Sequence, residues 1–268
     1  MPPISKRSLS AHARRAPVHD MELAGRRALI TGCLGTLGRD LAAAFHRAGA
    51  ELLLTDRAGE LPPDYPVAAA AVAHYFCADI GTCAGAEALA RRAIAAGAPD
   101  ILVNNAGIFP FVDLLDSDGA LFDRIIAVNA RAPFLLMRDI GAAMAASGRP
   151  GAIVNVSSAA AEVVRQDGVL YGASKAALET MTRAFAVRLA PLGIRVNAVR
   201  PGIATRPGGA IPVEHLQRIA GAVPMGRTLR ESEFAALVLF LCGEHAAFIT
   251  GQVIAVDGGS SLHRRMSA

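Results

Sequence analysis

Short apolar runs alternate along the chain with longer segments in which apolar residues recur at helical spacing. Each short run is bounded by Gly, Asp or Asn, a pattern typical of strands that are buried in a parallel sheet and covered by helices. The predicted strands are residues 27–31, 51–55, 73–77, 101–104, 152–156, 194–199 and 253–256. The predicted helices are residues 37–48, 84–96, 121–146, 171–189 and 231–241.

This alternation predicts a single α/β domain, a doubly wound Rossmann fold whose seven-stranded parallel sheet has helices on both faces. No internal repeat or low-complexity linker divides the 268 residues. Residues 202–225 are rich in Gly and Pro, and we expect them to form a lid.

The first twenty residues differ from the rest in charge. They contain Lys6, Arg7, Arg14 and Arg15 against Asp20, so they carry +3 of the net charge of +4. They lack the apolar core of a secretory signal. We therefore expect residues 1–20 to be a disordered basic extension, 21–262 to be the folded domain and 263–268 to be a tail. An organellar transit peptide and a translation start at position 21 are the alternatives.

Composition excludes several classes of partner. The rest of the chain carries only the remaining +1, lacks Trp and has few Tyr, so it offers neither a basic face nor a stacking surface for nucleic acid. No stretch reaches the roughly 18 unbroken apolar residues that a membrane span needs. The four cysteines show no C-x-x-C spacing and no metal-ligand pattern with the histidines. We predict no metal, and reduced thiols in a cytoplasmic protein.

A glycine-rich turn follows the first predicted strand. The segment TGCLGTLGRDL places Gly32, Gly35 and Gly38 between that strand and a helix, with Thr36 and Leu37 inside the turn. Glycines let the backbone approach a pyrophosphate closely, and the helix N-terminus binds its charge. The turn predicts a dinucleotide site, although three glycines could also make a simple tight connection.

Asp56 ends the second predicted strand. A carboxylate there accepts hydrogen bonds from the adenosine ribose hydroxyls and repels a 2′-phosphate, so we predict NAD as the cofactor. Arg57 beside it is the type of group that binds a 2′-phosphate, so NADP remains possible. An ordinary strand-ending Asp is the alternative interpretation.

The segment YGASK places Tyr171 and Lys175 four residues apart at the start of a predicted helix, on one face. An ammonium near a phenol favours the phenolate, so Lys175 is expected to lower the pKa of Tyr171 and let it exchange protons near neutral pH. The alternative is a surface Tyr that packs on a Lys stem.

At this point the chain resembles the short-chain dehydrogenase/reductase family, in its compact single-domain branch, from residue 22 to residue 259. The matching residues, in order, are Thr31-Gly32, Asp79, Asn104 to Gly107, Asn129, Ser158, Tyr171, Lys175, Pro201-Gly202 and Asp257 to Gly259.

The resemblance implies roles for the catalytic residues. Tyr171 would be the general acid in reduction and the base in oxidation, and Lys175 would hold the nicotinamide ribose. Ser158, thirteen residues before Tyr171, would donate to the substrate carbonyl, and Ser157 would take its place if the register were shifted by one. Asn129 would support a water that leads from Lys175 to solvent. A helix-kinking or capping Asn is its alternative, because Pro133 follows within a turn.

The resemblance also completes the cofactor site. The further residues expected to line it are Asp79, which would contact adenine, with Ile80, Asn105, Ala106, Gly107, Pro201, Gly202, Ile203 and Thr205. Thr205 comes one residue earlier than the family's carboxamide-binding Thr, and Arg206 takes the expected place.

The phosphate turn departs from the compact branch, because Thr36 replaces its middle glycine. The resulting G-x-x-G-x-x-G spacing is that of the longer branch, which carries a C-terminal substrate domain. Too few residues follow Val199 for such a domain, so we interpret the turn as a local variation, in which the Cβ of Thr36 leaves the cofactor affinity open.

Together these features predict an NAD(H)-dependent oxidoreductase that interconverts a secondary alcohol and a ketone. The pocket residues suggest a small or medium, partly apolar substrate: Phe109, Phe111, Glu162, Val163, Val164, Arg165, Gln166, Ile203 and Ile211. The alternatives are an NADP-dependent 3-oxoacyl-type reductase and a non-catalytic cofactor-binding regulator. The resemblance further implies a homo-oligomer, a tetramer in many members.

Overall fold

Seven parallel strands form the centre of the protein, in the order β3-β2-β1-β4-β5-β6-β7. The structure is a computed structural model that describes residues 23–164, 166–204 and 220–262. The strands are β1 (Arg27–Thr31), β2 (Glu51–Asp56), β3 (Val72–Cys77), β4 (Ile101–Asn104), β5 (Gly151–Val156), β6 (Ile194–Pro201) and β7 (Val253–Val256). The predicted Rossmann fold and its seven-stranded parallel sheet are confirmed, and each predicted strand lies within two residues of the observed one.

The apolar content of each strand follows its position in the sheet. β4 and β5 lie in the middle, and every one of their residues is buried. β3 and β7 lie at the edges, and most of their residues are partly or fully exposed. Central strands of a parallel sheet are covered on both faces, which is why their sequences are uninterrupted apolar runs.

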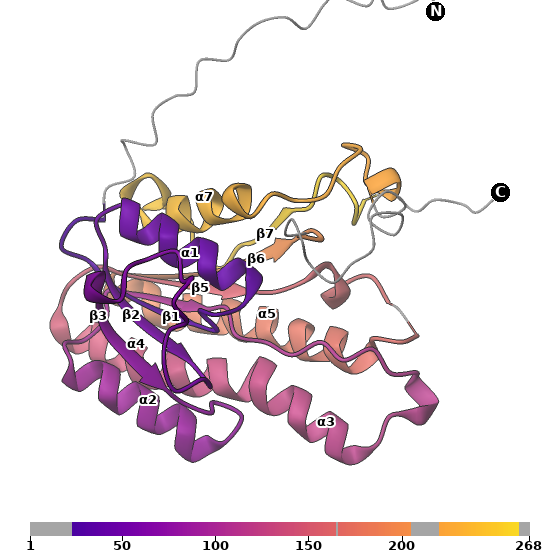
Figure 1. The fold of residues 1–268 in the computed structure, drawn as a ribbon, viewed down its shortest axis with the longest axis horizontal. Helices are drawn as coiled ribbons and strands as arrows, with labels where there is room; N and C mark the ends of the chain where they lie inside the picture. Colours follow the sequence, from indigo (N-terminus) through magenta and orange to yellow (C-terminus); the bar gives the residue numbers. More distant parts are fainter. Residues whose placement is uncertain (1–22, 165, 205–219, 263–268) are drawn as a thin grey trace, which may run out of the picture.

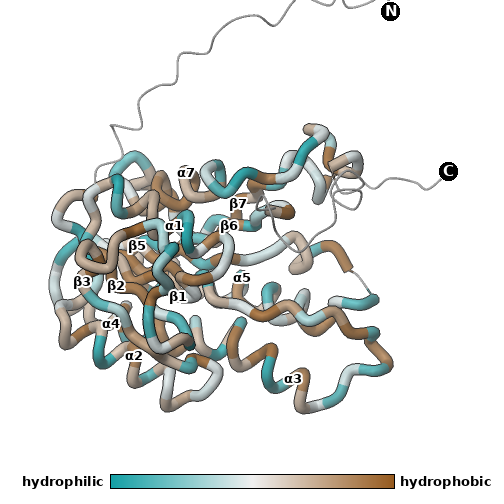
Figure 2. Tube along the Cα trace, viewed as in Figure 1, coloured by the Kyte–Doolittle hydropathy of each residue, from teal (hydrophilic) through white to brown (hydrophobic). Residues whose placement is uncertain are grey.

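Helices cover both faces of the sheet (Figure 1). On one face α1 (Thr36–Arg47) packs beside α7 (Glu231–Cys242), and on the other lie α2 (Cys83–Ala95), α4 (Ala132–Ser147) and α5 (Val169–Leu189). Each face has its own apolar core, one around Phe45 and Phe234 and the other around Leu136 and Ile153. Figure 2 shows apolar residues concentrated in the central strands, with apolar and polar residues alternating along the helices.

One predicted helix is interrupted. Residues 121–146 were expected to form a single helix, but the structure has α3 (Gly119–Ile126), a π-helical turn η4 (Ala127–Arg131) and then α4. Pro133 has no N–H to donate to the carbonyl of Asn129, and its ring crowds that carbonyl, so the chain leaves α-helical geometry here. Asn129 therefore lies within a π-helical turn between two α-helices.

The order of the strands reverses between β1 and β4, because β2 continues on one side and β5 on the other. Ligands of doubly wound sheets bind at the carboxyl ends of the strands at such a switch point. None of the described helices is both long and apolar enough to cross a membrane. The predicted extension, the tail and residues 205–219 of the predicted lid lie outside the described residues.

Candidate active site

A cleft of about 1060 Å³ opens at the switch point. Its floor is the turn between β1 and α1, where Gly32 has a φ of +66° and a Cβ would approach the Cα of Ala106 to 2.7 Å. A Cβ on Gly38 would lie 2.1 Å from the carbonyl oxygen of Gly32. These two positions therefore require glycine for the backbone to pack on itself.

The N-terminus of α1 faces this cleft without a capping side chain, and its first turn has no acidic residue. Gly35 is the exposed N-cap, and Thr36 and Leu37 follow in the first turn. Thr36 is exposed at the helix start, so its Cβ does not crowd the β1–α1 turn. Free N–H groups and the positive end of the helix dipole suit a pyrophosphate, and the volume and glycine cradle fit a dinucleotide.

The turn is fastened to the segment after β4. The hydroxyl of Thr31 accepts hydrogen bonds from the N–H groups of Asn105 and Ala106, both at 3.0 Å. The side-chain amide of Asn105 donates back to the carbonyls of Thr31 and Gly32, both at 2.9 Å. The resulting clamp holds β1 and β4 together at the point where the cleft opens.

Asp56 also lines the cleft, and its carboxylate binds two backbone N–H groups. Its Oδ2 accepts a hydrogen bond from the N–H of Leu34 at 3.0 Å, and its Oδ1 accepts one from the N–H of Arg57 at 2.8 Å. The carboxylate thus braces the glycine turn from the rim of the cleft. Arg57 is exposed on the same rim.

Most of the predicted cofactor residues line this cleft: Gly32, Gly35, Thr36, Leu37, Gly38, Asp56, Arg57, Asp79, Ile80, Asn105, Ala106, Gly107 and Gly202. Asp79 is exposed, with Oδ1 accepting from the N–H of Gly81. Pro201 and Ile203 flank Gly202 just outside the cleft wall, and Thr205 lies outside the described residues. Sequence reasoning missed several lining residues that carry no motif, among them Thr55, Ala78, Arg124 and Val128.

Tyr171, Ser158 and Lys175 converge beyond the inner end of the cleft. The hydroxyl of Ser158 interacts with that of Tyr171 and acts to lower the pKa of the phenol. The ammonium of Lys175 lies 5.8 Å from the centroid of the Tyr171 ring and donates to the carbonyl of Val156 at 2.7 Å. Phe109, which lines the cleft, packs edge-on to Tyr171 with ring centroids 6.2 Å apart, so cleft and triad are continuous.

The electrostatics of this group differ from the prediction. Burial raises the pKa of Tyr171 above its usual value, and the hydrogen bond with Ser158 acts in the opposite direction. Burial also lowers the pKa of Lys175 to about 8. The expected lowering of the Tyr171 pKa by Lys175 is not what this geometry produces, because the ammonium is directed to a backbone carbonyl and the phenol is buried.

Asn129 is fully buried in η4. Its amide donates to the carbonyl of Ile108 at 2.8 Å and to the hydroxyl of Ser174 at 3.1 Å, and its Oδ1 accepts from the N–H of Ile108 at 2.9 Å. A Cβ on Gly107 would lie 3.4 Å from both Asn129 Oδ1 and Lys175 Nζ. Asn129 therefore ties the segment after β4 to α5 next to Lys175.

The two neighbouring serines point in different directions. Ser157 is buried and donates to the carboxylate of Glu179 at 2.6 Å, whereas Ser158 is partly exposed and contacts Tyr171. Of the two serines considered, Ser158 is therefore the one directed toward Tyr171. Within the ranges that the structure describes, no group of three or more His, Cys, Asp or Glu could hold a metal ion.

Comparison with known proteins agrees with this arrangement. The profile of a family described as enoyl-(acyl carrier protein) reductase matches residues 32–261. Galactitol 2-dehydrogenase (L-tagatose-forming) from Cereibacter sphaeroides is 39% identical over an alignment of 252 positions that covers 90% of this chain and 96% of the relative. The chain belongs to the short-chain dehydrogenase/reductase family. Members of this kind are oxidoreductases that act on CH–OH groups.

Solved structures of the short-chain dehydrogenase/reductase family superpose on this fold. A Beutenbergia cavernae protein described as an NAD(P)-dependent gluconate 5-dehydrogenase, with NADP bound at low occupancy, has a TM-score of 0.84 at 32% identity. The match covers 91% of this chain and 99% of the Beutenbergia chain. The 3-ketoacyl-(acyl-carrier-protein) reductase from Brucella melitensis, complexed with NADH, has a TM-score of 0.76 at 33% identity. The match covers 90% of this chain and 100% of the reductase chain. Both nicotinamide cofactors thus occur in close structural relatives.

Proposed function

We propose that this chain is an NAD(H)-dependent oxidoreductase that interconverts a secondary alcohol and a ketone, with Tyr171 as its acid and base. The observation that carries the proposal is the meeting of Tyr171, Ser158 and Lys175 where the dinucleotide-sized cleft ends. A binding module without turnover has no use for these three groups together, so the enzyme is favoured over a cofactor-binding regulator.

The side chains divide the work of proton transfer. In reduction, the Tyr171 hydroxyl donates its proton to the carbonyl oxygen while Ser158 donates a hydrogen bond to the same oxygen. Bound nicotinamide supplies or accepts the hydride. A pKa of Tyr171 above its usual value keeps the phenol protonated at neutral pH, so the unliganded site is ready to act as an acid. Lys175, with a pKa of about 8, keeps most of its charge at pH 7 and can hold the ribose hydroxyls.

Asp56 favours NAD over NADP in this proposal. Its carboxylate lies on the rim of the cleft, where it can accept hydrogen bonds from ribose hydroxyls and would repel a 2′-phosphate. The exposed guanidinium of Arg57 supports the alternative with NADP, and the structural relatives include proteins with each cofactor.

The substrate we propose is small to medium and partly apolar. Phe109 and Phe111 are both 62% exposed and pack edge-on to each other beside Tyr171. Val112 donates to the carbonyl of Asp167 at 3.0 Å, which brings this apolar segment next to the loop that carries Val163 and Val164. The relatives named for galactitol and gluconate support a polyol or sugar acid, and the ketoacyl reductase supports a 3-oxoacyl group as the alternative.

We also propose a cytoplasmic homo-oligomer, a tetramer by analogy with the family. Phe134 on α4 packs edge-on to Phe185 on α5 and is 40% exposed, and Val187 on α5 is 79% exposed. Such apolar side chains on two long neighbouring helices support contact with a second copy. Free thiols at all four cysteines support a reducing compartment.

The test is a panel of polyols, sugar acids, 3-oxoacyl thioesters and aryl ketones followed by NADH and NADPH absorbance. The expected result is turnover of one class with NADH preferred. Tyr171→Phe should lower kcat by about 10³-fold while the Kd of NADH from fluorescence changes little. Wild-type turnover in Tyr171→Phe would remove this residue from its proposed role.

A further inference from the structure

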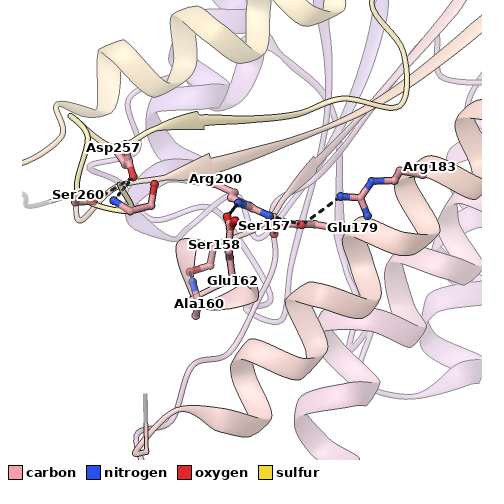
Figure 3. Close-up of polar contacts among 10 residues, drawn as sticks. Ser157, Ser158, Ala160, Glu162, Glu179, Arg183, Arg200, Asp257 and Ser260 are labelled. Atoms are coloured by element: carbon pink, nitrogen blue, oxygen red, sulfur yellow. Dashed lines mark hydrogen bonds and ion pairs between the residues drawn. The ribbon is translucent and has the colours of Figure 1, made fainter. Parts of the chain in front are cut away.

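A buried ion pair lies behind the Ser158 side of the site and has no part in the chemistry described above. The carboxylate of Glu179, which is 4% exposed, accepts two hydrogen bonds from the guanidinium of Arg200, each at 2.7 Å, and one from the hydroxyl of Ser157 at 2.6 Å (Figure 3). Paired hydrogen bonds between a guanidinium and a carboxylate constrain both distance and orientation. This geometry is therefore far more defined than that of a surface ion pair.

The three residues come from the three elements that build the catalytic end. Glu179 is on α5, one turn after Lys175, and Ser157 follows the last residue of β5. Arg200 lies at the end of β6, directly before Pro201 and the cleft residue Gly202. The network thus joins α5, β5 and β6 at the level of the site.

Arg200 also reaches across to the loop that follows Ser158. Its Nη1 pairs with the carboxylate of Glu162, at the end of the short helix η5 (Ala159–Ala161) whose N-cap is Ser158. Both ends of this short helix are therefore tied, one through Ser157 to Glu179 and the other through Glu162 to Arg200 (Figure 3).

Ser157 stands between two groups that the site uses. The carbonyl of Val156, its predecessor, receives the hydrogen bond of Lys175, and the hydroxyl of Ser158, its successor, contacts Tyr171. Because adjacent peptide planes are linked through the dihedral angles of residue 157, fixing the Ser157 side chain restricts the orientation of both neighbours.

The network acts through position and not through its charge. Burial opposes ionisation of Glu179, but the hydrogen bonds from Arg200 and Ser157 and the charges of Arg200 and Arg183 hold the pKa of its carboxyl below the usual value. Its negative charge is thus balanced locally. The lowered pKa of Lys175 has burial as its cause, with no contribution from Glu179.

We propose that Ser157, Glu179 and Arg200 form a positioning network that sets the Ser158 hydroxyl against Tyr171 and the Val156 carbonyl against Lys175. This inference rests on the proposed acid/base role of Tyr171. Loss of the network should loosen the Ser158–Tyr171 hydrogen bond, and with it the interaction that favours the phenolate. The ascending limb of the pH profile for alcohol oxidation should then move to higher pH.

The decisive variant is Ser157→Ala, which removes only the hydroxyl that donates to Glu179. Ser147→Ala is the control, because the Ser147 hydroxyl likewise donates one hydrogen bond, in its case to the backbone carbonyl of Met144, and lies at the end of α4, before the amino end of β5 and away from the site. We expect Ser157→Ala to lower kcat at least 5-fold and to move the limb upward by at least 0.5 pH, while the Kd of NADH stays within twofold. Ser147→Ala should change none of these.

Glu179→Gln tests the contact between Ser157 and Glu179 from α5. It should move the ascending limb of the pH profile in the same direction, to higher pH. If Ser157→Ala leaves the ascending limb of the pH profile unmoved and kcat within twofold of wild type, whatever its Tm, the proposed positioning role of the network is refuted. The proposed function would remain intact. Failure of the proposed function is distinguished by Tyr171→Phe, which would then keep wild-type turnover.

Discussion

At its nucleotide end the cleft is formed mainly by backbone, with glycines at 32, 35 and 38 and an uncapped helix N-terminus, whereas at its catalytic end buried charged side chains meet. The nucleotide end needs close backbone approach and free N–H groups, which a Cβ at Gly32 or Gly38 would obstruct. The catalytic end needs groups that change protonation, and these must be oriented and paired to be buried at all.

The two ends should therefore fail differently. Adding atoms damages the nucleotide end, because the backbone packs on itself at Gly32 and Gly38. Removing or neutralising groups damages the catalytic end, because Lys175 and Glu179 depend on specific partners. Three substitutions, each with a control, test this difference.

Lys175→Met should have the largest effect. It removes the ammonium beside Tyr171, so we expect kcat to fall by about 10³-fold in both directions of the reaction. Arg188→Met, which removes an exposed cation of the same helix, should stay within twofold of wild type. Steady-state kinetics with NADH decide this, and a loss below tenfold would show that the phenol works without the lysine.

The same substitution should stabilise the protein at neutral pH. Burial lowers the pKa of Lys175 from 10.5 to about 8, so between these values the unfolded chain binds a proton that the folded chain does not. The free energy of unfolding of the wild type therefore rises as pH rises through that window. Below the window the cost of burying the charged ammonium is fully present. A difference of about 2.5 pKa units corresponds to about 3 kcal/mol.

Chemical denaturation of both proteins at pH 7 and pH 10 measures this. Lys175→Met should be the more stable protein at pH 7, by less than that figure because it also loses the hydrogen bond to Val156, and its advantage should shrink by pH 10. Groups that titrate in the same way in both proteins cancel in the difference between their unfolding free energies. An advantage that grows with pH would contradict the assignment.

Gly38→Ala should come next, with a loss of about 2 kcal/mol in stability. In most helices this change is stabilising, but here the new Cβ would lie 2.1 Å from the carbonyl oxygen of Gly32 and 2.9 Å from the Cα of Cys33. Gly35→Ala is the matched control, since its Cβ meets only the Gly32 oxygen at 3.4 Å. Equal unfolding free energies for the two variants would refute the steric argument.

Asp56→Asn should have the smallest effect. It removes the charge that opposes a 2′-phosphate, so the ratio of NADH to NADPH efficiency should fall about tenfold, and because the amide keeps an oxygen for only one of the N–H groups of Leu34 and Arg57, Tm should fall modestly. Asp64→Asn, an exposed carboxylate that pairs with Arg39, is the control and should leave the ratio unchanged. An unchanged ratio in Asp56→Asn would mean that another residue discriminates between the ribose 2′-hydroxyl of NADH and the 2′-phosphate of NADPH.

Much of the fold follows from local pattern. The uninterrupted apolar runs at β4 and β5 predict buried parallel strands because covered strands have no polar face, and the glycines at 32 and 38 predict the turn because no other residue fits there. The spacing of Tyr171 and Lys175 places both on one face of α5 by helical geometry alone. Such features depend on residues that are close in the sequence, so the sequence by itself determined them.

Other features depend on where distant segments meet, and only the tertiary structure decided them. The partnership of Ser157 with Glu179 and Arg200 joins β5, α5 and β6, and no local spacing encodes it. The upward shift of the Tyr171 pKa likewise follows from burial of the phenol among distant segments. A side chain's protonation depends on its three-dimensional surroundings, which periodicity along the chain does not contain.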